Sequence, residues 1–254
     1  MELRTVTATR YVTPLREGGS LPAIVEGDDD GLYVLKFRGA GQGPKALVAE
    51  VIAGELARAA GLPVPEIVLM ELDPDMARTE PDPEIQALIR ASAGLNVALD
   101  YLPGSVMFDP VAEAPGADIA SAIVWFDAYV TNIDRTARNV NLLTWHRKLW
   151  LIDHGAALYF HHAQGDPASR VGDRFTQVAK HVLLPFATRL AEADARLPAK
   201  LGRETIAGVC DLVPGSWLEG GFPREAYAEY LARRLDAPRA FAGEAQRAHD
   251  ALHV

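Results

Sequence analysis

The sequence predicts an α+β protein of two lobes, with a strand-rich first half and a mostly helical second half. Three patterns lead to this prediction. Two short apolar runs flank a polar turn within residues 23–37, an almost wholly apolar stretch covers residues 117–130, and helical patterns dominate from about residue 170 onward. We expect an N-terminal lobe over residues 1–102 and a C-terminal lobe over residues 103–254, with a ligand site in the crevice between them.

The first half begins with a glycine-rich turn followed by a hairpin, whose predicted strands are residues 23–26 (AIVE) and 32–37 (LYVLKF). A helix is expected from Pro44 to about Ala60, because proline favours the first helical turn and Gly61 supplies a stop signal. Residues 65–73 form another strand. The stretch 73–84 is rich in proline and acidic residues and is predicted to be an exposed loop. A short helix (84–93) and a strand (95–102) complete this half.

The second half opens with the predicted buried helix at residues 117–130. A polar loop at 131–139 and a tight hairpin at 141–153, turning at residues 146–148, come next. The four tryptophans are interpreted as core or hairpin residues rather than as a base-stacking platform: Trp125, Trp145, Trp150 and Trp217.

The composition is that of an ordinary globular protein, with 49% hydrophobic and 23% charged residues. A net charge of -9 disfavours a nucleic-acid or anionic-membrane surface. No run approaches the roughly 20 apolar residues of a membrane-spanning helix. The N-terminal sequence lacks the apolar core of a secretory signal, and the single cysteine, Cys210, cannot form an internal disulfide, so a cytoplasmic location is expected. The apolar run around Cys210 favours a buried structural thiol over a nucleophile.

The strongest chemical signal is a polar loop followed, after a hairpin, by Asp-His-Gly. Asn139 lies five residues after Asp134, and Asp153 comes directly after the predicted hairpin. Phosphoryl transfer needs a carboxylate near the attacking hydroxyl and oxygen ligands for magnesium, and kinases place these groups in this order. Each residue alone fits an ordinary turn. The order of helix, loop, hairpin and Asp-x-Gly favours catalysis, and it predicts a bilobal protein-kinase-like fold.

A lysine on the second hairpin strand is the next candidate. Strand alternation places Lys36 on one face with Val34, opposite Leu35. A lysine between apolar residues is costly to bury without a partner, and Glu50 in the following helix can supply one. Kinases use such a pair to hold the lysine on the nucleotide phosphates. The alternatives are a lysine whose charged end reaches solvent, or Glu55 as the partner.

Other candidates weigh less. Gly18, Gly19 and Ser20 precede the first hairpin strand, and such glycines allow backbone N–H groups to approach phosphates, although the sequence also fits a flexible turn. Two adjacent histidines, 161 and 162, lack a third ligand at metal-site spacing. Ser105 and Ser216 lack the sequence context of a hydrolase nucleophile.

The segments VLKF, AEVIAGELARAAGLPVPE, TNIDRTARNVNLL and LIDHG together resemble the HipA-like kinases, over roughly residues 15–160. They are also similar, more distantly, to type II phosphatidylinositol 4-kinases. The resemblance implies that Lys36 binds the ATP phosphates and that Glu50 is its helix partner. It further implies that Asp134 is the catalytic base and that Asn139 and Asp153 are the Mg²⁺ ligands.

The resemblance also implies an adenine-binding hinge and a modification site. Asp100, Tyr101 and Leu102 would receive adenine through backbone hydrogen bonds. In HipA-type kinases a serine of the phosphate-covering loop can be autophosphorylated, and Ser20 is the candidate here.

The sequence departs from the kinase pattern at several positions. The loop reads Asn-Ile-Asp where ordinary kinases have His-Arg-Asp, and Thr136 replaces the usual lysine two residues after the catalytic Asp. Arg135 or Arg138 could neutralise charge instead, or either could lie on the surface. No Ala-Pro-Glu segment is found. Because the sequence starts almost at the nucleotide loop, an N-terminal subdomain and a HipA-style antitoxin partner are not expected.

These observations predict an ATP- and magnesium-dependent phosphotransferase. The acceptor is expected to be a hydroxyl group, with protein Ser/Thr favoured by family analogy. One alternative is a nucleotide-binding pseudokinase that acts as a regulatory interaction module. The other is a small-molecule kinase, although the loop lacks the histidine that such enzymes usually carry before the catalytic Asp.

Overall fold

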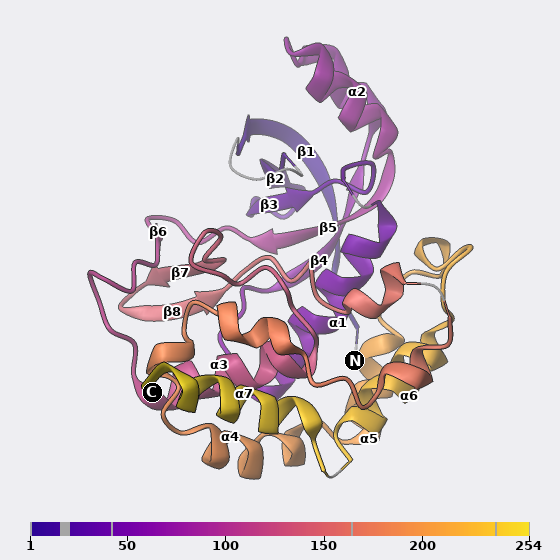
Figure 1. The fold of residues 1–254 in the computed structure, drawn as a ribbon. Helices are drawn as coiled ribbons and strands as arrows, with labels where there is room; N and C mark the ends of the chain where they lie inside the picture. The colour runs from indigo at the N-terminus through magenta and orange to yellow at the C-terminus, as the bar shows by residue number, and fades with distance from the viewer. Residues whose placement is uncertain (1, 16–20, 42, 164, 237, 254) are drawn as a thin grey trace.

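The computed structural model describes residues 2–15, 21–41, 43–163, 165–236 and 238–253. Five strands of the first half close into a barrel in the order β1-β2-β3-β5-β4, in which only β1 and β4 run parallel (Figure 1). They are β1 (Thr5–Pro14), β2 (Ala23–Gly27), β3 (Leu32–Lys36), β4 (Ile67–Leu72) and β5 (Gly94–Asp100).

The first strand, β1, was not predicted. Most of its side chains are exposed, and only Val6 and Ala8 are buried. Its apolar alternation is therefore too short to be detected as a strand. The barrel is completed by pairing with β2 on one side and β4 on the other, which are tertiary contacts.

The alternation predicted for β3 is confirmed. Tyr33, Leu35 and Phe37 are buried in the apolar cluster of the barrel, and Lys36 lies on the opposite face with a side chain that is 14% exposed. Lys36 is thereby directed out of the barrel interior, toward the helix that follows in the sequence.

Helix α1 (Pro44–Ala60) has the predicted bounds. It ends at Gly61, whose φ of 83° is accessible to glycine, and the amides of Gly61 and Leu62 donate to carbonyls of the last turn. Its middle is buried on all sides, and Gly54 packs against β4. A Cβ atom at Gly54 would lie 2.4 Å from the Ile67 Cδ1 atom, so the missing side chain permits the close approach of helix and strand.

Gly54→Val is expected to lower the free energy of unfolding by roughly 1–3 kcal/mol, because the buried Ile67 side chain has little room to move. Chemical denaturation measures the change. The matched control is Gly208→Val in a later helix, where a Cβ atom meets nothing within 4 Å. Equal stability of the two variants would contradict the packing argument.

The stretch 73–84, predicted to be an exposed loop, contains regular structure, so that prediction is wrong. Residues Pro74–Thr79 form a 3₁₀ turn, with Ala77 fully buried, and helix α2 (Pro83–Ala91) follows. Asp73 and Asp82 each accept a hydrogen bond from an amide at the start of these turns. An Asp followed by Pro is a helix-start signal as well as a loop signal, and here it starts helices.

The second half begins with a small sheet and a central helix. Strands β6 (Val106–Met107), β7 (Leu142–Trp145) and β8 (Lys148–Leu151) pair in antiparallel order, and α3 (Ala117–Tyr129) is buried as predicted. The predicted hairpin is confirmed: it turns at His146 and Arg147, which both have positive φ, as tight hairpin turns require.

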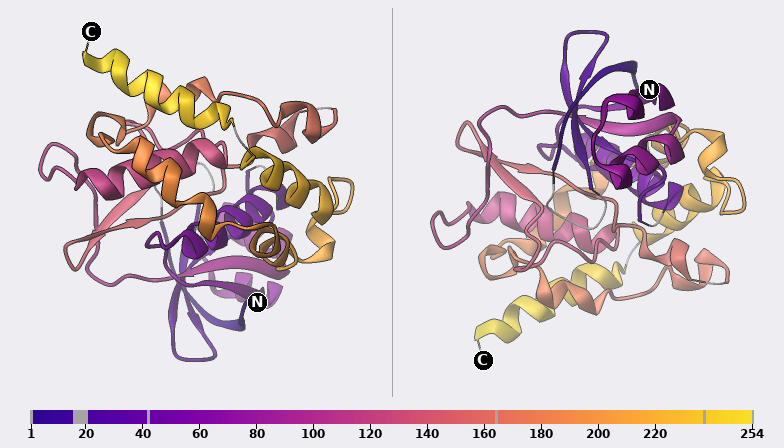
Figure 2. Two further views of the ribbon diagram at one scale, coloured as in Figure 1. Left: turned by 90° about the horizontal axis from the view of Figure 1, so that it is seen from below. Right: turned by 90° about the horizontal axis from the view of Figure 1, so that it is seen from above.

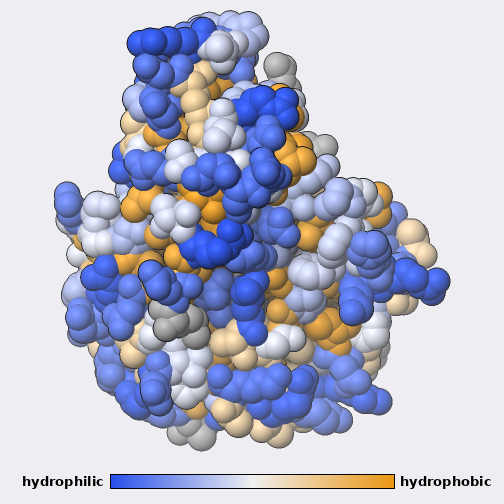
Figure 3. Space-filling view, turned by 180° about the vertical axis from the view of Figure 1, so that it is seen from behind, coloured by the Kyte–Doolittle hydropathy of each residue, from blue (hydrophilic) through white to orange (hydrophobic). Residues whose placement is uncertain are grey.

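The remaining described chain is helical, but residues 159–163 and 165–189 form only short 3₁₀ turns between irregular segments. The later helices are α4 (Leu190–Arg196), α5 (Arg203–Cys210), α6 (Arg224–Arg234) and α7 (Ala240–Asp250). Figure 2 shows α7 at the opposite end of the molecule from the barrel. The face in Figure 3 is mostly hydrophilic, with apolar side chains in scattered patches. In the described part of the chain, no helix is both long enough and apolar enough to cross a bilayer. The division at residues 102 and 103 stays a prediction.

Candidate active site

Lys36 contacts two carboxylates that come from distant parts of the sequence. Its Nζ atom lies 2.6 Å from Glu50 Oε2 and 2.6 Å from Asp153 Oδ1. Burial acts to lower the pKa of Lys36, but the two carboxylates more than compensate, so the pKa is raised and the amine stays charged. The three predicted residues are therefore in direct contact, although Asp153 lies 117 positions after Lys36.

Glu50 is fully buried and is held from two sides. Besides Lys36, the backbone amide of His154 donates to Glu50 Oε2 at 2.8 Å. Burial acts to raise the pKa of Glu50, but Lys36 and the contacts with His154 lower it to about 2. Since His154 directly follows Asp153, this carboxylate ties helix α1 to the Asp-His-Gly segment. Glu55, the alternative partner, instead pairs with Arg58.

Asp134 and Asn139 meet within the predicted loop. The Asn139 side-chain amide donates to Asp134 Oδ2 at 2.7 Å. The pKa of Asp134 is raised, first by partial burial and then by the nearby charge of Asp153, and the Asn139 hydrogen bond only partly opposes this. Asp153 itself has a φ of 56°, in the left-handed region that non-glycine residues adopt rarely, though Asp more readily than most.

A buried carboxylate that the sequence analysis did not single out anchors this loop. Asp127, on α3, is fully buried. Its carboxylate accepts from the side-chain amide of Asn132 at 3.1 Å, from Arg135 Nε at 2.6 Å and from His181 Nε2 at 2.9 Å. Because His181 Nδ1 accepts from the Leu183 amide, the proton of the neutral ring is on Nε2. The available signal was an Asp inside an otherwise apolar helix, since a buried carboxylate needs partners.

This network reaches the predicted catalytic residues. The side-chain oxygen of Asn132, Oδ1, accepts from the Asp134 backbone amide at 3.2 Å. Arg135 donates to the carbonyls of Asn141 and Ile152, which lie just before β7 and just after β8 of the hairpin that leads to Asp153. Arg135 is 1% exposed and paired with Asp127, so the expectation that it neutralises phosphate charge or lies on the surface is wrong. Arg138, the other candidate, is exposed.

With this geometry in place, the comparison with family models is decisive. Residues 9–236 match the model described as HipA-like kinase. The chain belongs to the HipA-like kinase family. The resemblance drawn from the sequence motifs is thereby confirmed.

Solved structures show the same protein-kinase-like fold, with a strand-rich first part and a helical second part. The proinflammatory kinase CtkA of Helicobacter pylori matches with a TM-score of 0.55 and 14% identity, over 98% of this chain and 99% of that chain. The Golgi casein kinase with Mn/ADP bound matches with a TM-score of 0.55 and 10% identity, over 100% of this chain and 74% of that chain. A comparison with curated proteins found no match.

In the hinge predicted for this HipA-like kinase, two of the three backbone amides already donate hydrogen bonds within the protein. The Asp100 amide donates to the Glu66 carbonyl and the Tyr101 amide to the Leu32 carbonyl, so neither can donate to a base. The Leu102 amide makes no hydrogen bond with any residue that the structure describes. The predicted hinge is thus reduced to one amide donor.

Those remaining candidate residues of the sequence analysis that the structure describes do not contribute to this contact network. Gly18, Gly19 and Ser20 are outside the described residues. Cys210 is buried, as predicted, and burial raises the pKa of its thiol to about 12. His161 is buried against Tyr227, and burial lowers its pKa to about 3. The crevice expected between the lobes is not the cavity described below, whose described lining comes from residues 131–230.

Proposed function

We propose that this HipA-like kinase transfers the γ-phosphoryl group of ATP to a hydroxyl acceptor, with protein serine or threonine as the acceptor class. The observation that carries the proposal is the contact of Lys36 with both Glu50 and Asp153, next to the Asp134–Asn139 pair. A lysine held by a fully buried carboxylate is pre-positioned to bind phosphate oxygens without further ordering.

Asp134 would orient the acceptor hydroxyl. In the transfer, the acceptor oxygen bonds to the γ-phosphorus, the bond from that phosphorus to the β–γ bridging oxygen breaks, and ADP leaves. The hydroxyl proton passes to an Asp134 carboxylate oxygen. The raised pKa of Asp134 suits a proton acceptor better than an ordinary exposed aspartate would.

The donor set fits a magnesium ion. Asn139 uses its side-chain nitrogen on Asp134, which leaves the amide oxygen as the free ligand atom, and the Asp153 carboxylate is 42% exposed. Both are the hard oxygen donors that magnesium prefers. When bound, the ion supplies positive charge to the phosphate oxygens. The Golgi casein kinase neighbour was crystallised with Mn/ADP, which supports the use of a nucleotide and a divalent metal.

The Leu102 amide is the proposed donor to adenine, because the amides of Asp100 and Tyr101 are already paired. The pseudokinase alternative is less well supported, since all five candidate residues are retained: Lys36 contacts Glu50 and Asp153, and Asn139 contacts Asp134.

Incubation with γ-labelled ATP and a mixture of Ser/Thr-containing proteins tests the proposal. Label is expected on protein in the presence of Mg²⁺, and EDTA is expected to reduce it to background, because the charge on the phosphates is then uncompensated. If ATP raises the melting temperature while neither transfer nor hydrolysis occurs, the protein is a pseudokinase and the proposal is wrong.

A further inference from the structure

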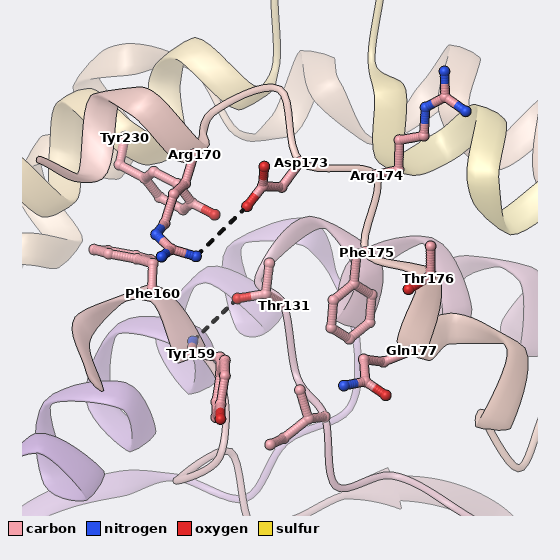
Figure 4. A pocket seen from close by; sticks show the side chains of 11 residues that line it. Thr131, Tyr159, Phe160, Arg170, Asp173, Arg174, Phe175, Thr176, Gln177 and Tyr230 are labelled. Atoms are coloured by element: carbon pink, nitrogen blue, oxygen red, sulfur yellow. Dashed lines mark hydrogen bonds and ion pairs between the residues drawn. The ribbon is translucent and has the colours of Figure 1, made fainter. Parts of the chain in front are cut away.

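A cavity of about 300 Å³ lies beside the catalytic loop, on the side of the helical half (Figure 4). Ile133, which directly precedes Asp134, and Thr131, three residues before it, form part of its wall. The rest comes from the segment after Asp-His-Gly, from residues 170–177 and from α6. None of the residues proposed to bind ATP or magnesium lines it, so it is a separate site that adjoins Asp134.

Aromatic side chains form much of the wall. Tyr159, Phe160, Phe175 and Tyr230 line the cavity, and Tyr159 is 51% exposed. Such walls are typical of a site for an aromatic or large aliphatic group. Phe175 has a φ of 58°, which is rare for a bulky residue and indicates that the surrounding structure holds it there.

A buried arginine keeps the cavity preformed. Arg234 is 2% exposed and donates to the Ala128 and Tyr129 carbonyls at the end of α3, at 3.1 and 3.0 Å. It also donates to the Val171 and Asp173 carbonyls, both at 3.0 Å, in the loop that lines the cavity. Arg234 thereby joins this loop to the end of the helix that leads into the catalytic loop.

The rim of the cavity is basic in an otherwise acidic protein. Arg170 and Arg174 stand against one carboxylate, Asp173, and the Arg170–Asp173 distance is 3.9 Å, a weak contact. The whole chain has a net charge of -9. An acidic group on the ligand is therefore favoured here, and disfavoured on the other side of the cavity, near Asp134 and its neighbouring Asp153.

The placement of polar groups separates a peptide from a small metabolite. A metabolite site holds its ligand with polar groups that converge inside an enclosed cavity. Here the charged and amide side chains of Asp173, Arg174 and Gln177 are exposed, and the buried hydroxyl of Thr131 in the wall already accepts a hydrogen bond from the Tyr159 amide. This arrangement fits an extended chain that crosses the surface and inserts one side chain.

We propose that this cavity binds the acceptor, and that the acceptor is a polypeptide segment with a large apolar side chain near its Ser/Thr hydroxyl and an acidic residue beyond that side chain. The proposal rests on the kinase activity proposed above. It specifies the side chains near the Ser/Thr hydroxyl of the acceptor, which the kinase activity alone does not define.

The test is phosphorylation of a Ser/Thr peptide library with labelled ATP, followed by kcat/KM measurements on the best peptide. Replacing its apolar residue by alanine is expected to lower kcat/KM at least about tenfold, and replacing its acidic residue by lysine about fivefold. Arg170→Glu is expected to reverse the charge preference, and Tyr159→Ala to weaken the apolar preference. Both side chains are partly exposed, so the variants should fold; their melting temperatures check this.

Arg196→Glu is the matched control, because Arg196 is an exposed arginine on α4 away from the cavity. It should keep the wild-type peptide preference. If peptides are phosphorylated without selection for the apolar or the acidic residue, the proposed acceptor site is wrong. The same holds if Arg170→Glu keeps the wild-type charge preference. Neither result would contradict the proposed kinase activity. Phosphorylation of small molecules in place of every peptide also overturns it. If no phosphate is transferred to any acceptor, including water, the proposed kinase activity and the proposed acceptor site are both wrong.

Discussion

Asp134→Asn is expected to lower kcat for phosphate transfer by about 10²- to 10⁴-fold, because the amide cannot accept the hydroxyl proton. The change should preserve geometry, since the new amide oxygen can still accept from Asn139. The KM for ATP should change little, because Lys36, not Asp134, is proposed to hold the phosphates. Steady-state kinetics with a labelled protein acceptor measure both constants.

The pH dependence of kcat/KM provides a second test of the proposed role of Asp134. The pKa of Asp134 is raised, so the residue takes up a proton at a higher pH than an exposed aspartate. Wild-type kcat/KM should therefore fall as the pH drops through this pKa, and the Asp134→Asn variant should lack that decrease. Asp211→Asn, at an exposed position after α5, is the matched control and should behave as wild type. A wild-type kcat in Asp134→Asn would exclude the proposed role.

Asp127→Ala is expected to cause the largest loss of stability among single polar substitutions at the site, roughly 3–5 kcal/mol, because it leaves the Arg135 charge buried without a partner. For a chain of this size, the melting temperature should fall on the order of 10 °C. Kinase activity should also fall, since Asn132 and Arg135 position the segments that carry Asp134 and Asp153.

A double variant separates loss of a partner from loss of packing. Asp127→Ala with Arg135→Met removes the buried charge, so it should be more stable than Asp127→Ala alone, while activity should stay low because the loop has lost its anchor. Thermal and chemical denaturation of the single and double variants measure the difference. A double variant less stable than the single one would show that the destabilisation does not come from the unpaired arginine.

Local signals were enough to predict much of the fold. Pro44 and Gly61 marked the bounds of α1, and the alternation around Lys36 gave the correct buried face of β3. Strand β1 was not predicted, and the turns at residues 74–79 were predicted to be loop. In β1 the apolar pattern is too brief, and in the turns Asp and Pro are compatible with both a loop and a helix start.

The chemistry of the site was predicted in part. The residue types and the order of Lys36, Glu50, Asp134, Asn139 and Asp153 were visible in the sequence, because kinase chemistry needs those groups in that order. Glu50 was the predicted partner of Lys36 and Glu55 the alternative; the contact of Glu50 with Lys36 comes from the packing of α1, since both carboxylates lie on the same helix.

The sequence by itself therefore determined the family and the strand-then-helix organisation, and it named the residues proposed to perform phosphoryl transfer. The tertiary structure alone decided what holds them. The Asp127 network, the hinge amides already paired within the barrel and the cavity fixed by Arg234 all join segments that are far apart along the chain. Local sequence patterns report backbone preference and burial, whereas hydrogen bonds between distant residues depend on how the elements pack.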